Sequence, residues 1–196
     1  ISFWVKTNSA GKTSGHFVMG LGAYYGLQYE IFGAYDGSKF AIQYQHATGT
    51  AAEDMYFPKD ATDNTNGGWV GHTFAKKLTE AQMIALLKDT WLHVVYTYNA
   101  PTKVGTLYFN GEKMKSFDFN LWPAGDAKLG VTGLKYAGVA PEVVNKFALG
   151  FIQSRDGTLW DNEPWGGYDF PGANHFKGQL DDIRVWHKAI TGNEIL

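Results

Sequence analysis

One stretch of the sequence, residues 154–174, combines aromatic rings with acidic and amide side chains at close spacing. Sugars present C–H-rich faces and a rim of hydroxyl groups. A site that binds them therefore pairs flat rings with short side chains that accept and donate hydrogen bonds in one plane. This composition predicts a carbohydrate-binding loop, whose candidate ligand-binding residues are Trp160, Trp165, Tyr168, Asp161, Asn162 and Asp169.

The same loop has a second interpretation, in which its rings only pack against one another. A long loop needs a small core of its own to be ordered, and two tryptophans can provide it. The sequence leaves both interpretations open. For the other candidate rings, Trp69, Trp122 and the pair Tyr24 and Tyr25, we expect a packing role.

No pattern in the sequence predicts nucleophilic or zinc chemistry. The chain has no cysteine and no Gly-x-Ser-x-Gly motif, so thiol catalysis and a nucleophile elbow are not expected. The six histidines show neither His-x-His nor His-x-x-x-His spacing, which argues against a zinc site. His93, flanked by apolar residues, is predicted to be a partly buried strand histidine.

The elements that must position these residues are mostly strands. Apolar and aromatic runs separated by turn residues predict strands over 17–21, 27–32, 39–45, 91–98, 105–109, 113–117, 146–153 and 180–186. Asn110-Gly111 predicts a type I′ turn between two of them. Residues 47–75 are expected to form a long surface excursion and residues 121–145 to be irregular.

One short helix is also expected. Thr79 and Gln82 have the spacing of a capping box, and apolar residues follow at helical spacing until about Asp89. Many short strands with no regular strand–helix alternation predict an all-β fold, a two-sheet antiparallel β-sandwich with one short helix.

Composition and charge limit the function classes. The chain has 196 residues, of which 44% are hydrophobic and 16% aromatic, so we expect a single domain over residues 1–196. A formal charge of −2 without Lys/Arg runs gives no reason to expect nucleic acid as a partner. No apolar run is long enough for a membrane span, so we expect no membrane insertion.

Three segments together carry a resemblance to a known family. They are Ile1-Ser-Phe-Trp-Val-Lys6, the two runs within residues 91–111, and Leu180-Asp-Asp-Ile-Arg-Val-Trp186 followed by Thr191-Gly-Asn-Glu194. The chain resembles the laminin-G-like, concanavalin-A-like jelly-roll domains of bacterial surface and polysaccharide-utilisation proteins. These motifs determine the fold and say little about the ligand.

The resemblance also implies a structural Ca²⁺. In related glucanase-type jelly rolls, an aspartate at the start of the last strand ligates calcium, and Asp181 matches that position. The alternative is that Asp181 caps a turn and Asp182 pairs with Arg184. In that interpretation no metal is bound.

The resemblance also bears on catalysis and on chain length. The related glucanases carry a Glu-x-Asp-x-x-Glu run because retaining hydrolysis needs two carboxyl groups about 5 Å apart. No such run is present, and Glu53 and Asp54 are expected to be solvated. Since these families have further strands upstream, we expect this sequence to lack N-terminal strands and to belong to a longer chain with other domains.

The sequence thus predicts a non-catalytic module that recognises a polysaccharide or other glycan. The protein would be extracellular, on the cell surface or periplasmic. Two other functions remain open. One is a protein-binding adhesion or scaffold domain. The other is a glycoside hydrolase or lyase whose acids come from separate strands.

Overall fold

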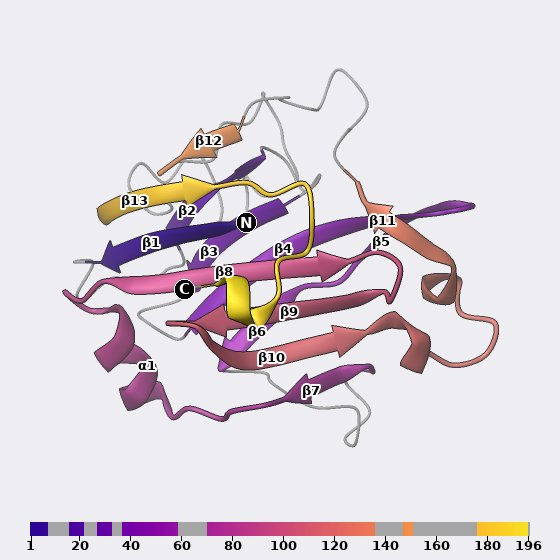
Figure 1. Ribbon diagram of the computed structural model, residues 1–196, viewed down its shortest axis with the longest axis horizontal. Helices are drawn as coiled ribbons and strands as arrows, with labels where there is room; N and C mark the ends of the chain where they lie inside the picture. The colour runs from indigo at the N-terminus through magenta and orange to yellow at the C-terminus, as the bar shows by residue number, and fades with distance from the viewer. Residues whose placement is uncertain are drawn as a thin grey trace, which may run out of the picture.

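The structure, a computed structural model, describes residues 1–7, 16–21, 27–32, 37–58, 70–135, 147–150 and 176–195. In these residues two antiparallel sheets are layered, accompanied by one short α-helix (Figure 1). This architecture confirms the predicted all-β sandwich.

The first sheet contains six strands in the described part of the chain, in the order β13-β1-β8-β9-β10-β7. The strands are β1 (Ser2–Thr7), β7 (His72–Phe74), β8 (Leu92–Asn99), β9 (Val104–Phe109), β10 (Glu112–Asp118) and β13 (Gly178–Arg184). Strands β1 and β13 pair side by side although they lie at opposite ends of the sequence.

The second sheet follows the order β11-β4-β3-β2-β12, and β5 and β6 also pair with β4. Its described strands are β2 (His16–Leu21), β3 (Leu27–Phe32), β4 (Gly37–His46), β5 (Gly49–Ala52), β6 (Met55–Pro58), β11 (Val131–Leu134) and β12 (Phe147–Leu149). Strand β4 is the centre of this sheet because four other strands pair along its two edges.

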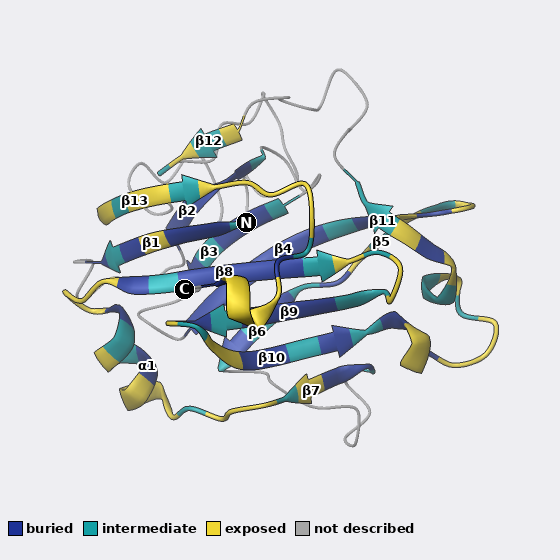
Figure 2. Cartoon of the chain, viewed as in Figure 1, coloured by how far each residue is buried: buried dark blue, intermediate teal, exposed yellow. Residues whose placement is uncertain are grey.

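The core between the sheets is rich in aromatic rings. Phe3 is fully buried and its ring lies 4.9 Å from that of Tyr29, which in turn lies 4.6 Å from the ring of Phe40. Residues that alternate with these point outward, because successive side chains of a strand face opposite sides of a sheet. Figure 2 shows that buried residues are concentrated on the central strands and exposed ones on β13.

The helix α1 (Glu80–Leu87) forms where the capping box predicts it. The Thr79 hydroxyl accepts the backbone N–H of Gln82 at 3.3 Å, and the Gln82 side chain accepts the N–H of Thr79 at 2.9 Å. Met83 and Leu87 are buried against the core. No helix in the described segments is long and apolar enough to cross a membrane.

The prediction of a long surface excursion over residues 47–75 is wrong for the described part. Strands β5 and β6 fold back along β4, and β7 pairs with β10. The small and polar residues of β5 give little strand signal, since pairing with β4 rather than intrinsic propensity holds them extended. For the same reason the expected irregular region contains β11, which also pairs with β4, and the 3₁₀ helix η2 (Ala127–Gly130).

The strand predicted over residues 180–186 forms as β13 up to Arg184, but its side chains do not alternate strictly. Leu180 and Ile183 both pack against the core, although a regular strand would place them on opposite faces. The cause is a β-bulge: Trp4 pairs with Asp181 and Ser2 with Arg184, so two residues of β13 oppose one residue of β1. This extra residue decides which side chains of β13 reach the outer surface.

Candidate functional site

A groove of about 540 Å³ lies on the outer face of the six-stranded sheet, the side turned away from the second sheet. In Figure 1 the C-terminal segment, drawn in yellow, crosses this same face. The groove is lined by Ser2, Trp4, Trp91, His93, Asn110, Gly111, Asp182, Arg184, Trp186, Ile190, Glu194 and Ile195.

Strand alternation brings Trp4 into this groove. Phe3 and Val5 are buried in the core, so Trp4 between them faces outward and is 36% exposed. His93 is its direct cross-strand partner on β8, and the two rings stack with centroids 4.8 Å apart and planes inclined by 17°. The stack holds the indole plane in one orientation on the sheet surface.

Two more tryptophans border the groove. Trp91 precedes β8 and is 42% exposed, and Trp186 follows β13 and is 37% exposed. The indole N–H of Trp186 donates to the Ser2 hydroxyl at 3.2 Å, which fixes the ring against β1. All three rings therefore keep an accessible surface, and those of Trp4 and Trp186 are also held by neighbouring side chains.

The polar groups of the groove come from the bulged strand and from a hairpin turn. The Arg184 Nε donates to the Asp182 carboxylate at 2.7 Å. The Asn110 side chain accepts the backbone N–H of His93 at 2.9 Å. Asn110 and Gly111 have φ values of 49° and 79°, as the predicted type I′ turn requires. Burial lowers the pKa of His93, so its ring is neutral at pH 7.

The C-terminal segment forms one side of the groove. Ile190 and Ile195 cover Val95 on the outer face of β8. The 3₁₀ helix η3 (Gly192–Glu194) holds them there, and the Glu194 carboxylate accepts the N–H of Thr191 at 2.9 Å. Glu194 also pairs with Lys188, so this side of the groove carries a balanced pair of charges.

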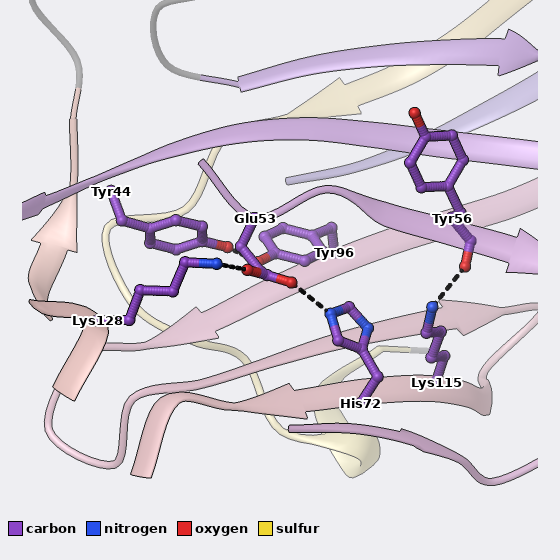
Figure 3. A network of polar contacts seen from close by, with 7 residues as sticks. All are labelled: Tyr44, Glu53, Tyr56, His72, Tyr96, Lys115 and Lys128. Carbon is purple, nitrogen blue, oxygen red and sulfur yellow. Dashed lines mark hydrogen bonds and ion pairs between the residues drawn. The ribbon is translucent and has the colours of Figure 1, made fainter. Parts of the chain in front are cut away.

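A second cluster of polar side chains lies between the two sheets (Figure 3). One Glu53 oxygen lies 2.6 Å from His72 Nε2, and the other lies 2.6 Å from Lys128 Nζ. Glu53 is only 5% exposed, so the expectation that it would be solvated is wrong. Asp54 likewise lies 3.6 Å from Lys39 and is largely covered. Partner residues distant in sequence make this burial possible.

Two further contacts, which the same view shows, extend the interior network. The hydroxyls of Tyr44 and Tyr96 lie 2.5 Å apart, and Lys115 donates to the Tyr56 carbonyl at 2.9 Å. Burial lowers the pKa of His72 and raises that of Tyr44. Because Glu53 is enclosed by these elements, we assign the network to structure rather than to ligand binding.

The sequence-predicted loop residues Trp160, Trp165, Tyr168, Asp161, Asn162 and Asp169 lie outside the described residues, as do Trp69, Tyr24 and Tyr25. Trp122 is described and is 9% exposed, with its ring 5.1 Å from that of Phe119, which confirms its packing role.

Calcium binding at Asp181 stays a prediction. The Asp181 side chain accepts the backbone N–H of Asp182 at 2.8 Å, within β13. No group of three or more His, Cys, Asp or Glu residues that could hold a metal occurs among the described residues. The Asp182–Arg184 pair of the alternative interpretation is present.

The sequence prediction missed the groove. The sequence patterns assign Trp4, Trp91 and Trp186 only to motifs of the fold, although Trp4 stands between two apolar residues in a strand and alternation alone places it outside. The contributions of Trp91, Asn110 and Arg184 to one surface could not be read from local sequence, because they come from separate elements.

Comparisons with known proteins support the fold. No protein-family model and no curated protein matches the sequence.

Seven solved chains do match. One is a putative carbohydrate binding protein from Bacteroides ovatus, with 18% identity and a TM-score of 0.51. Another is HCR/D-Sa-GBL1/C, with 13% identity and a TM-score of 0.52. Each match covers 99% of this chain. It covers only 38% of the first matched chain and 34% of the second, so this chain spans about a third of the length of these structures. At such identities the similarity shows a shared fold.

Proposed function

We propose that this chain is a non-catalytic carbohydrate-recognition domain of the laminin-G-like type, and that the outer groove binds the glycan. The observation that carries the proposal is the presence of three tryptophan rings in one groove, each between 36% and 42% exposed, beside an ion pair. Such a protein would act where polysaccharides occur, on the cell surface or in a secreted form.

The chemistry of the groove suits sugars better than it suits an apolar partner. An indole face packs against the C–H side of a pyranose, while carboxylate, guanidinium and amide groups bond its hydroxyls. The groove offers both kinds of contact side by side. The name of the Bacteroides ovatus neighbour adds support at the level of a shared fold.

The acidic groups of the groove do not fit glycoside hydrolysis. A general acid in that reaction needs a raised pKa so that it is protonated before it acts. The ion pair with Lys188 and the hydrogen bonds from Thr191 instead lower the pKa of Glu194 to about 2. Asp182 is paired with Arg184. This arrangement supports binding without bond cleavage.

Affinity electrophoresis tests the proposal. Native gels would contain galactomannan, xylan, a β-glucan, polygalacturonate or chondroitin sulfate, and retardation of the protein would report binding. We expect Trp4→Ala, Trp91→Ala or Trp186→Ala to reduce retardation, and the corresponding Trp→Phe variants to retain most of it because a ring remains. Thermal denaturation of each variant would show that the fold is intact.

Trp160→Ala and Trp165→Ala provide the competing arm. If they abolish retardation and the groove variants do not, the glycan binds at the loop and not in the groove. If neither set changes retardation by any of the five glycans, or if the wild type is never retarded, carbohydrate recognition by this domain is wrong and a protein partner becomes the better hypothesis.

A further inference from the structure

We infer that the Asp182–Arg184 pair forms hydrogen bonds with two adjacent hydroxyl groups of an uncharged sugar. The β-bulge at Asp182 positions this pair in the groove. The inference rests on the proposed function and names its substrate class: a neutral glycan rather than a uronate or a sulfated one. It is carried by the bulge, by the charge pairing in the groove and by the chemistry of the two side chains.

The bulge determines which residues of β13 face the groove. Leu180 packs against the core, so a regular strand starting there would direct Asp182, Arg184 and Trp186 to the core as well. The additional residue shifts the alternation, and Ile183 faces the core instead. As a result Asp182, Arg184 and Trp186 all line the groove.

The bulge places an unusual backbone conformation at the site itself. Asp182 has a φ of 46°, in the left-handed region that favours glycine. Aspartate tolerates this region better than most residues but less well than glycine. A glycine would form the same bulge with less strain, so the presence of a carboxylate here calls for a role beyond the backbone.

The two side chains form a matched donor and acceptor. Arg184 offers planar N–H donors, and the carboxylate of Asp182 offers acceptor oxygens. Their side chains are 57% and 46% exposed, so the pair itself adds little to folding stability while both groups remain accessible to a ligand. Two neighbouring sugar hydroxyls, one accepting and one donating, complement such a pair.

The charges of the groove favour an uncharged ligand. Asp182 compensates Arg184, and Lys188 compensates Glu194. His93 adds little positive charge at pH 7, because burial lowers its pKa below the ordinary value of 6.5. An anionic sugar would have to compete with Asp182 for the guanidinium, and it would gain no uncompensated cation from the residues that line the groove.

Three variants test the inference, with binding measured by affinity electrophoresis and stability by thermal denaturation. Asp182→Gly removes the carboxylate but suits the backbone, so we expect binding to the best neutral glycan among galactomannan, xylan and β-glucan to weaken about tenfold with no loss of thermal stability. Asp182→Asn keeps the shape and one acceptor, so it should weaken binding less. Arg184→Lys keeps the charge but loses the planar donors, and should weaken binding about as much as Asp182→Gly.

Glu112→Gln is the matched control, because it removes a carboxylate from an exposed ion pair with Lys76 that does not line the groove. It should bind as the wild type does. If Asp182→Gly also binds normally while Trp4→Ala does not, the groove binds glycan but this inference is wrong. Tighter binding of polygalacturonate or chondroitin sulfate than of every neutral glycan would overturn it as well. If neither the tryptophan variants nor Asp182→Gly changes binding, both the proposed function and this inference are wrong.

Discussion

The residue whose position differs most from expectation is Glu53. Its neighbours in sequence are small or charged, so local composition predicts a solvated side chain. In the structure its two oxygens contact His72 and Lys128, which are contributed by β7 and by η2. A carboxylate can be buried in this way only when its partners neutralise the charge and satisfy its hydrogen bonds.

Removing the Glu53 carboxylate should therefore destabilise the fold strongly. Loss of one member of a buried ion pair leaves the other charged or polar groups without compensation, so we expect Glu53→Ala to lower the unfolding free energy by about 3 kcal/mol. Urea denaturation measures this change. Glu112→Ala, which breaks an exposed pair with Lys76, serves as the control and should have a much smaller effect. Equal losses in the two variants would contradict the structural role of the network.

His72 predicts a dependence of stability on pH. Burial lowers its pKa below the ordinary value of 6.5, so below that pH the unfolded chain binds a proton that the folded state does not. Stability from this group is fully present above about pH 6.5 and falls as the pH decreases. Glu30 and Asp54, whose pKa values are raised by burial, act with the opposite sign, because the folded state binds their protons more readily than the unfolded chain does.

A comparison of wild type with His72→Gln isolates this contribution. The variant keeps a side chain that can hydrogen-bond to Glu53 but does not titrate. We expect its unfolding free energy, measured in urea between pH 7.5 and pH 5 at about half-unit intervals, to fall less steeply with acidification than that of the wild type. Identical slopes would show that His72 does not carry the pH dependence.

At the scale of elements, local signals predicted best where a few adjacent residues decide the conformation. The capping box at Thr79 starts α1, and the Asn110-Gly111 turn joins β9 to β10. Prediction failed for β5 and β11, which are extended because they pair with β4. It failed again at Asp182, where the register against β1 introduces the bulge.

The cap of α1 can be tested by itself. The Thr79 hydroxyl accepts the N–H of Gln82, which otherwise has no partner within the first turn of the helix. We expect Thr79→Ala to lower the unfolding free energy by about 1 kcal/mol, and Thr79→Ser to retain most of it because the hydroxyl remains. Urea denaturation measures both. A serine variant as unstable as the alanine one would mean that the methyl group, not the cap, is responsible.

At the scale of the whole molecule, the two sheets are built from strands that the chain visits out of order. Strand β8 lies between β1 and β9, and β4 has partners on both edges. Strands β7 and β13 lie at the two edges of the first sheet as described. The central strands can therefore open only when most of the sandwich is disrupted.

Hydrogen exchange should reflect that order. We expect the amides of β4 and β8 to exchange slowest, near the rate set by global unfolding, and those of β7 and β13 to exchange faster through local opening. Exchange followed by mass spectrometry or by NMR measures this ranking. Protection of β13 equal to that of β8 would indicate that the edge of the first sheet is covered.

The sequence by itself determined the fold class, the helix start, the hairpin turn and the approximate ranges of several strands. These features depend on alternation and turn chemistry within a few residues. Only the tertiary structure decided that Glu53 is buried, that β13 is bulged and that Trp4, Trp91 and Trp186 share a groove with Asp182 and Arg184. The physical reason is that strand pairing and register join segments far apart in the chain, and local patterns do not specify which segments will meet.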